Sequence, residues 1–345
     1  EVSEDASCGG RHTACACHHS DGATRVAYLI GTDEAGYGPN LGPLVVSATV
    51  WEVPEGTGPG DLFRLLDGVI APTPRDASDG RVAVADSKRL YQPGKGLRLL
   101  ERGLLGTMGA IGRRPAAWRE AWDALAPAAQ DTLATVPWYA GYRAPVPVDA
   151  DGRDVEAVAA SLGDGLEAAG VRLIDVRSRA VFPEEFNRLC DEHGTKGAAL
   201  SHVTLALAAE LSRPLGAGPI SVLCDKHGGR NRYADLLADH FPDHFIESPW
   251  TNRHRSVYRF GPAGRRVEFR FQAKGESYLQ AALASMASKY LRELAMQAFN
   301  AFWCSRVPGL KPTAGYPQDA RRFKAAIASV QAELGIEDDI LWRRR

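Results

Sequence analysis

The sequence has no long apolar run, no excess of charge of either sign and few cysteines. No window of about 18 residues is apolar and uncharged throughout, and the mean hydropathy is −0.23, which excludes an ordinary membrane-spanning helix. The formal net charge is −1, from 41 basic and 42 acidic residues, so the whole chain lacks the strong positive charge typical of nucleic-acid-binding proteins. The six cysteines do not form a disulfide framework, which favours a reducing compartment. The N-terminal residues have no apolar stretch after a basic start, so we expect no secretory signal, no membrane partner and a cytoplasmic location.

The content of hydrophobic residues and the length of the chain indicate a folded protein with insertions. Hydrophobic residues make up 45% of the 345 positions, and this length fits roughly two domains or one large domain with insertions. Residues 1–24 are polar and aperiodic, which is typical of a disordered tail. The Cys and His residues of this tail do not have the spacing of a structural zinc site: Cys8, Cys15, Cys17, His18 and His19. Residues 100–170 are rich in Ala, Pro and aromatic side chains and predict a mostly helical inserted subdomain, which leaves 25–99 and 171–335 as the main domain.

Short apolar runs of strand type alternate with longer segments of helix type. The strands are expected at 26–31, 44–53, 171–176, 220–224, 245–246, 256–260 and 266–271. The helices are expected at 61–69, 183–190, 200–211, 233–240, 278–303 and 319–334. Strands come first and then alternate with helices, which predicts an α/β fold around a mixed sheet flanked by helices.

Carboxylates stand where these strands end. Asp33 and Glu34 follow an apolar strand at a glycine-rich turn, Asp225 follows a second apolar strand, and Glu276 begins the long helix. Adjacent strands that end at one edge of a sheet bring such side chains together, and gathered carboxylates repel one another unless a cation lies between them. Hard oxygen ligands select Mg²⁺ or Mn²⁺, and such sites hydrolyse phosphodiesters.

Each acid also has an ordinary structural explanation. Glu276 is favourable at a helix N-terminus, and Asp225 suits a turn. Four acids that each lie near glycines at the end of a strand or the start of a helix would be a rare coincidence. A shared divalent-metal site explains all four positions together.

Several motifs then resemble a known family. The stretch from Tyr28 to Pro39 ends in Asp-Glu-Ala-Gly-Tyr-Gly-Pro, and Leu-Gly-Pro-Leu-Val-Val follows from Leu41. Asp-Ser-Lys at 86–88, Lys-Gly-Glu-Ser at 274–277 and Gly-Tyr-Pro at 315–317 come later in the chain. These motifs resemble, in the same order, those of the type-2 ribonucleases H, with Glu276 in place of Asp as in the type-3 branch. The resemblance covers roughly residues 26–99 and 171–330.

The resemblance implies a ribonuclease H-like fold and a monomer that uses Mg²⁺ or Mn²⁺. It implies hydrolysis of RNA in an RNA–DNA hybrid, or in a duplex with embedded ribonucleotides, to 5′-phosphate and 3′-hydroxyl ends. The implied metal ligands and catalytic residues are Asp33, Glu34, Asp225 and Glu276. The implied substrate contacts are Gly36 and Gly38 near the ribose 2′-hydroxyl, Tyr37, Lys88 on a phosphate and Tyr316 on the sugar. Tyr37 stands where the family has Arg, which removes one cation near the scissile phosphate.

One segment is strongly basic, although the net charge of the whole chain is close to zero. Residues 251–274 hold seven basic residues against the single acid Glu268. They are Arg253, Arg255, Arg259, Arg265, Arg266, Arg270 and Lys274. This pattern predicts either a track for a phosphate backbone or the solvated face of a hairpin. Arg230 and Arg232 would add to such a track, and Arg343–Arg345 would extend it or form a tail.

Two other functions fit the same residues. One is a nuclease of this fold that acts on another nucleic acid, such as a single strand or a branched junction. The other is a catalytically silent nucleic-acid-binding protein. A pure binding protein has no use for four repelling carboxylates, so the silent alternative is disfavoured.

Overall fold

The computed structural model describes residues 26–344, apart from residues 92, 93, 95, 228, 229 and 274. For Ser78 and Glu276 it describes the backbone and not the side chain. The predicted tail at 1–24, with its Cys and His residues, therefore lies outside the described residues, as do Lys274 and Arg345.

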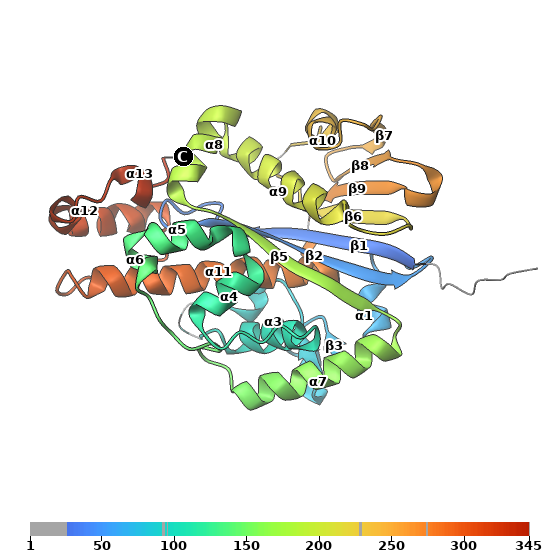
Figure 1. The fold of residues 1–345 in the computed structure, drawn as a ribbon, viewed down its shortest axis with the longest axis horizontal. Helices are drawn as coiled ribbons and strands as arrows, with labels where there is room; N and C mark the ends of the chain where they lie inside the picture. Colours follow the sequence, from blue (N-terminus) through green and yellow to red (C-terminus); the bar gives the residue numbers. More distant parts are fainter. Residues whose placement is uncertain (1–25, 92–93, 95, 228–229, 274, 345) are drawn as a thin grey trace, which may run out of the picture.

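A seven-stranded mixed sheet forms the centre of the protein, in the order β5-β2-β1-β6-β9-β8-β7 (Figure 1). Its strands are β1 (Val26–Ala35), β2 (Leu44–Pro54), β5 (Arg172–Val181), β6 (Ile220–Cys224), β7 (Glu247–Thr251), β8 (Arg255–Phe260) and β9 (Val267–Gln272). β6 runs parallel to both β1 and β9, and the other neighbours are antiparallel. β3 (Ile70–Ala71) and β4 (Val82–Ala83) form a separate parallel pair. The predicted α/β fold around a mixed sheet is confirmed.

Helices cover both faces of this sheet. They are α1 (Leu62–Leu65), α2 (Ser87–Leu90), α3 (Arg98–Ala110), α4 (Trp118–Leu125), α5 (Gln130–Thr135), α6 (Pro137–Ala140), α7 (Gly152–Ala168), α8 (Pro183–His193), α9 (Lys196–Ser212), α10 (Ala234–His240), α11 (Leu279–Cys304), α12 (Pro317–Glu333) and α13 (Asp338–Leu341). Short 3-10 turns are η1 (Asp76–Asp79), η2 (Pro127–Ala129), η3 (Ala263–Arg265) and η4 (Gly275–Ser277).

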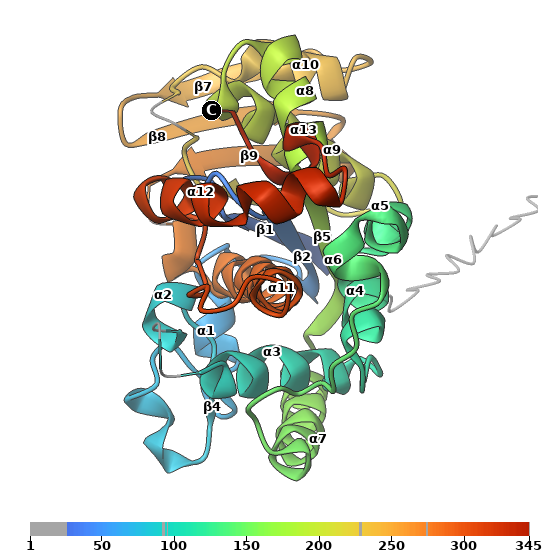
Figure 2. The same cartoon turned by 90° about the vertical axis from the view of Figure 1, so that its left-hand side faces the viewer.

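The alternation of side chains along β1 creates two cores. Ala27 and Leu29 point to the face covered by α11, whereas Tyr28 and Ile30 point to the face covered by α9. Figure 2 shows α11 and α9 on opposite sides of β1 and β2. The sheet is therefore buried on both faces at its centre, which explains the nearly continuous apolar runs in the sequence.

The segment at 100–170 is mostly helical, as the sequence indicates. Its aromatic side chains are buried against α11 rather than in a core of their own, and the indole of Trp118 donates to the carbonyl of Leu294 (3.0 Å). The buried carboxylate of Glu101 accepts hydrogen bonds from the backbone amides of residues 148–150 and from the Tyr290 hydroxyl. These contacts fix the segment to the layer that supports the sheet.

Helix α11 lies unusually close to β1. A side chain at Gly31 would collide with the backbone of Gln280 and Ala281, so only glycine fits at this point of the strand. Further along, the hydroxyl of Ser288 donates to the backbone carbonyl of Asp33 (2.9 Å). Small residues of α11 therefore set the position of the end of β1, where the predicted acids lie.

One predicted strand was wrong. Residues 245–246 precede the edge strand, which begins at Glu247, and Phe245 is 85% exposed. The strand that follows this apolar pair, β7, is an edge strand whose residues are all exposed. Among the described helices, none combines the length and the apolar character needed to cross a bilayer.

Candidate active site

The ends of β1 and β6 bring two predicted acids to the same level of the sheet. Gly31 pairs with Leu223 in the parallel register, and Asp33 and Asp225 each lie two residues further along. Glu34 follows Asp33 within β1. The amide of Gly275 donates to Oδ1 of Asp225 (2.9 Å), which brings η4, and with it the backbone of Glu276, to the same place.

The three described carboxylates influence one another. Burial raises the pKa of the Asp33 carboxyl well above its usual range, the charge of Glu34 raises it further, and Asp225 adds a smaller effect in the same direction. A side-chain hydrogen bond to Ser285 of α11 acts in the opposite direction. Asp33 thus lies in a region of accumulated negative charge.

The side chains of Asp33 and Glu34 leave the strand on opposite faces. Asp33 contacts Ser285 on the α11 face, whereas the charge of Glu34 reaches Tyr37, which lies beside α9. Among the described side chains, no group of three or more His, Cys, Asp or Glu is close enough to hold a metal ion. The side chain of Glu276 is outside that description.

The residues nevertheless fit a divalent cation by their chemistry. Carboxylate oxygens are the ligands that Mg²⁺ and Mn²⁺ prefer. A cation would offset the repulsion from Glu34 and Asp225, which adds to the effect of burial on the pKa of Asp33. The assignment of Asp33, Glu34, Asp225 and Glu276 as metal ligands stays a prediction.

The two glycines beside Tyr37 have different surroundings. Gly36 has a φ of +88°, and a side chain there would collide with the carbonyl oxygen of Pro43 and with Arg292. A Cβ at Gly38 would meet only the ring of Tyr316, at 3.8 Å. Packing inside the protein therefore explains the glycine at 36, whereas the space beside Gly38 is open and is bounded by the exposed Tyr316.

The remaining predicted contacts lie around this site. Lys88 is exposed on α2, next to Ser87, whose hydroxyl accepts a hydrogen bond from Ser285 (3.0 Å). Because Ser285 also contacts Asp33, Lys88 lies one residue from a short polar chain that leads to the acids. Arg230 is half-buried in the loop that follows Asp225, and its amide donates to the carbonyl of His227 (2.9 Å).

Three residues that contact Asp33 or the loop after Glu34 were not predicted for this site, and Arg343 was expected only to extend the basic track or to form a tail. Ser285 was visible only as part of a run of small residues on α11. Lys196 begins α9 and places its ammonium nitrogen 4.8 Å from the centre of the Tyr37 ring. Arg343 donates to the carbonyl oxygens of Tyr37 (3.2 Å) and Pro39.

The predicted basic track is largely neutralised. Arg259 and Arg270 both pair with Glu268 (2.8 Å each), and Arg266 pairs with Glu247. Arg265 donates to carbonyl oxygens after α9, including that of Ser212 (2.9 Å).

The ends of the predicted track also need correction. Arg253 and Arg255 are exposed at the β7–β8 turn and take part in none of the ion pairs found among the described residues. Arg343 is fully buried and does not extend the track, and Arg344 pairs with Asp191 (2.9 Å).

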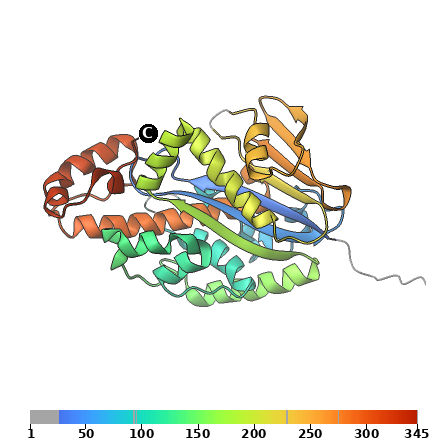
Figure 3. The same ribbon diagram turned by 45° about the horizontal axis from the view of Figure 1, so that its top comes forward.

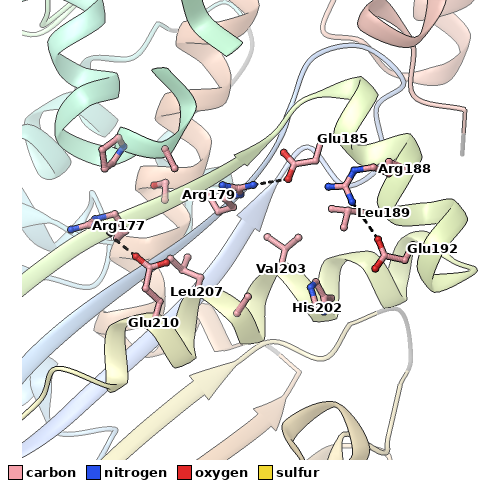
Figure 4. Close-up of a pocket in the computed structure, with 14 residues that line it drawn as sticks. Arg177, Arg179, Glu185, Arg188, Leu189, Glu192, His202, Val203, Leu207 and Glu210 are labelled. Carbon is pink, nitrogen blue, oxygen red and sulfur yellow. Dashed lines mark hydrogen bonds and ion pairs between the residues drawn. The ribbon is translucent and has the colours of Figure 1, made fainter. Parts of the chain in front are cut away.

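A well-formed cavity lies elsewhere, between β5, α8 and α9. It has a volume of about 360 Å³, and Figure 4 shows its charged lining. These charges compensate one another, because Arg179 pairs with Glu185 (2.6 Å), Arg188 with Glu192 (3.3 Å) and Arg177 with Glu210 (3.8 Å). A polyanion therefore gains little from this cavity.

Comparisons with known proteins give structural likenesses at low identity. No protein-family model matches the chain, and no curated protein sequence matches it. The ribonuclease H2 of Pyrococcus horikoshii OT3 is 16% identical over 91% of this chain and 92% of that chain, with a TM-score of 0.42. The RNase HII of Archaeoglobus fulgidus, solved in a complex with PCNA, is 14% identical over 92% of this chain and 94% of that chain, with a TM-score of 0.42. Bst-RNase HIII in complex with Mn²⁺ is 12% identical over 94% of this chain and 68% of that chain, with a TM-score of 0.39. At TM-scores this low, the proposals below rest on the residues of this chain.

Proposed function

We propose that this protein is a divalent-metal-dependent endonuclease that hydrolyses the RNA strand of RNA–DNA hybrids, or of duplexes with embedded ribonucleotides. The observation that carries the proposal is the position of Asp33 and Asp225 at the same level of β1 and β6, with Glu34 next to Asp33 in the chain. Burial raises the pKa of Asp33, and the charges of Glu34 and Asp225 raise it further, which is a cost that a purely structural strand end has no reason to bear.

The chain's own residues prepare this site for a bound cation. Asp33, Glu34, Asp225 and Glu276 would hold a divalent ion, which when bound would activate water and neutralise charge at the scissile phosphate. The amide of Gly275 orients the Asp225 carboxylate, and Ser288 fixes the backbone of Asp33. Both contacts reduce the reorganisation that the acids need when they bind a ligand.

The open space beside Gly38 suits the sugar that distinguishes RNA from DNA. Without a side chain at 38, a ribose can approach the backbone there while the exposed ring of Tyr316 lies against it. In the reaction, a water oxygen bonds to phosphorus while the bond from phosphorus to the 3′-oxygen breaks, and the 3′-oxygen takes up a proton. The products then carry a 5′-phosphate and a 3′-hydroxyl.

Cleavage of a set of labelled substrates tests the proposal. The set contains an RNA–DNA hybrid, a DNA duplex with one ribonucleotide, all-DNA and all-RNA duplexes, a single strand and a branched junction, each with Mg²⁺, Mn²⁺ or EDTA. We expect cleavage of the first two substrates only, with either metal ion and not with EDTA. Cyclic 2′,3′-phosphate ends or equal cleavage of all-DNA duplex would contradict the proposal. Cleavage confined to the single strand or junction would identify a different nuclease, and binding without cleavage would identify a silent binding protein.

Replacement of one acid tests the site itself. Asp225→Asn retains an oxygen that accepts the hydrogen bond from Gly275 and removes one of the repelling charges. We expect cleavage to fall by more than the roughly 100-fold that loss of an outer-shell partner costs. The melting temperature should stay unchanged or rise, because a source of repulsion with Asp33 is removed. An active Asp225→Asn variant, measured with the same hybrid, would exclude Asp225 from the reaction.

A further inference from the structure

Lys196 stands at the edge of the candidate active site. It is the first residue of α9, and its ammonium nitrogen lies 4.8 Å from the centre of the Tyr37 ring. Burial raises the pKa of Tyr37, and the negative charge of Glu34 raises it further, so the phenol lies within the electrostatic reach of that acid. The ring thus connects a lysine on α9 with a carboxylate at the end of β1.

The second turn of α9 contacts the loop after Asp225 through Ser201. The hydroxyl of Ser201 donates to the carbonyl of Gly197 (2.9 Å) and hydrogen-bonds with Nδ1 of His227 (3.1 Å). His227 is buried and lies two residues after Asp225, so it connects the end of β6 with this turn. A Cβ at Gly197 would lie only 3.4 Å from the Tyr37 hydroxyl, which shows how closely the first turn of the helix passes the ring. Lys196 therefore lies beside the loop that follows the acids of β1, on a helix that also contacts the loop after Asp225.

Two other lysines of this protein also lie over aromatic rings, but their charges are neutralised by carboxylates. Lys289 lies 4.3 Å from the ring centre of Tyr91 and pairs with Glu293 (2.5 Å). Lys324 lies 5.1 Å from the ring centre of Trp342 and pairs with Asp338 (2.7 Å).

Those two lysines are thus neutralised by neighbouring carboxylates. Lys196 takes part in none of the ion pairs found in the described part of the chain. A ring contact orients an ammonium group without cancelling its charge, so Lys196 retains the capacity to bind an anion.

We propose that Lys196, held by the ring of Tyr37, binds a backbone phosphate of the nucleic acid at the candidate active site. The inference rests on the proposed function and adds a substrate-binding residue to it. A polyanion that approaches Asp33, Glu34 and Asp225 is repelled by them, and a lysine beside these acids offsets that repulsion at one phosphate. Tyr37 then acts as a positioning residue, because its ring restricts the rotation of the long lysine side chain before binding.

Binding in the absence of divalent metal separates this role from cleavage. Fluorescence anisotropy of a labelled hybrid in EDTA, over a series of salt concentrations, gives both the affinity and its salt dependence. Lys196→Met retains the apolar stem against the ring and removes the charge. We expect binding to weaken about ten-fold at low salt and the slope of log K against log salt to fall by about 1. Lys196→Arg should keep the wild-type slope, and Tyr37→Leu should weaken binding with the slope retained, since the charge remains.

Arg306→Ala is the matched control. Arg306 is an exposed cation that lies 3.7 Å from the ring centre of Phe302 after α11, and its hydrogen bonds go to Phe302 and Ser305. Its replacement removes one charge and one ring contact, and it should change neither affinity nor slope. If Lys196→Met binds like the wild type, or if Arg306→Ala loses as much slope, the inference is overturned. A wild-type protein that cleaves hybrids while Lys196→Met is unaffected would overturn this inference alone, whereas a wild type that neither binds nor cleaves nucleic acid would overturn the proposed function with it.

Discussion

A substitution at Gly38 should change the cleavage of substrate without changing the stability of the protein. The φ of Gly38 is not in the left-handed region, and a Cβ there would make an ordinary contact with Tyr316 at 3.8 Å. Gly38→Ala should therefore leave the melting temperature unchanged. If a sugar approaches the backbone at this point, the added methyl group blocks it, and we expect hybrid cleavage to fall with KM raised more than kcat is lowered.

Gly36→Ala gives the contrasting result and serves as the comparison. Its φ of +88° and the collision with Pro43 and Arg292 strain the loop whether or not a substrate is present. We expect a lower melting temperature for this variant, measured by thermal unfolding without nucleic acid. Unimpaired cleavage of hybrids by Gly38→Ala would show that the sugar does not approach residue 38.

At the scale of elements, the strand β8 carries two arginines that should behave differently. Arg255 is exposed, lies 5.9 Å from the ring centre of Trp250 and belongs to none of the ion pairs of the described residues. Arg259 pairs with Glu268, which also pairs with Arg270. The hairpin adjoins the acids, because the ammonium of Lys226, next to Asp225, donates to the carbonyl of Asn252 (2.7 Å).

We expect Arg255→Ala to reduce the salt dependence of hybrid binding by about 1 in the log–log slope. Arg259→Ala should leave the slope unchanged, because Arg259 is already neutralised and Glu268 keeps Arg270 as its partner. Titrations in EDTA at several salt concentrations measure both variants. Equal slopes for wild type and Arg255→Ala would show that the hairpin is only a solvated face.

The main strands and helices could be predicted from the sequence. The spacing of apolar residues and the glycines at turns are local properties of the chain. β6 was predicted at its observed bounds, and α11 is displaced by one residue at each end. The convergence of Asp33 with Asp225 was also predictable, since parallel strands end at one edge. Ion pairs such as Arg259 with Glu268 join residues of different strands, so the run of arginines gave no sign of them.

At the scale of the whole molecule, the last described residues pack against the loop between β1 and β2. Arg343 and Asn40 exchange hydrogen bonds, with the amide of Arg343 donating to the Asn40 carbonyl (2.9 Å) and the Asn40 side chain donating to the Arg343 carbonyl (2.7 Å). The guanidinium carbon lies 4.3 Å from the ring centre of Phe186, and burial lowers the pKa of Arg343 to about 9. An arginine-rich end is typical of a solvated tail, so this position was not predictable from composition.

This packing brings the buried guanidinium of Arg343 into contact with the backbone of Tyr37. Arg343 donates to the Tyr37 carbonyl from inside the protein, while Lys196 contacts the ring from α9. The loop that contains Tyr37 is thus held between two cations from distant parts of the chain. Figure 3 shows the C-terminal helices (red) and the β7–β9 strands (orange) at opposite ends of the molecule. The candidate active site therefore depends on the folding of the whole described chain rather than on the motif at 33–39 alone.

A stack of histidines joins three helices on the α9 face of the sheet. The rings of His193 and His202 lie 4.5 Å apart, and those of His202 and His240 lie 5.0 Å apart. Burial lowers the pKa of His202 and of His240, and the neighbouring histidines lower both further. Glu192 and Asp239 act in the opposite direction on His202, as Asp239 does on His240, while Arg213 adds to the lowering at His240.

The stack should make the stability of the fold depend on pH. A lowered pKa means that the folded protein resists protonation, so the stabilising contribution is complete above the unfolded value of about 6.5 and is lost as the pH falls below it. We expect the melting temperature of the wild type to fall between pH 7 and pH 5 by more than that of His202→Gln, measured by thermal unfolding in buffers of equal ionic strength. The raised pKa of Asp33 has the opposite sign and is common to both proteins, so the difference between the two curves isolates the stack. His254→Gln, on the exposed β7–β8 turn, should follow the wild-type curve. Superimposed curves for wild type and His202→Gln would show that the stacked rings contribute nothing to this dependence.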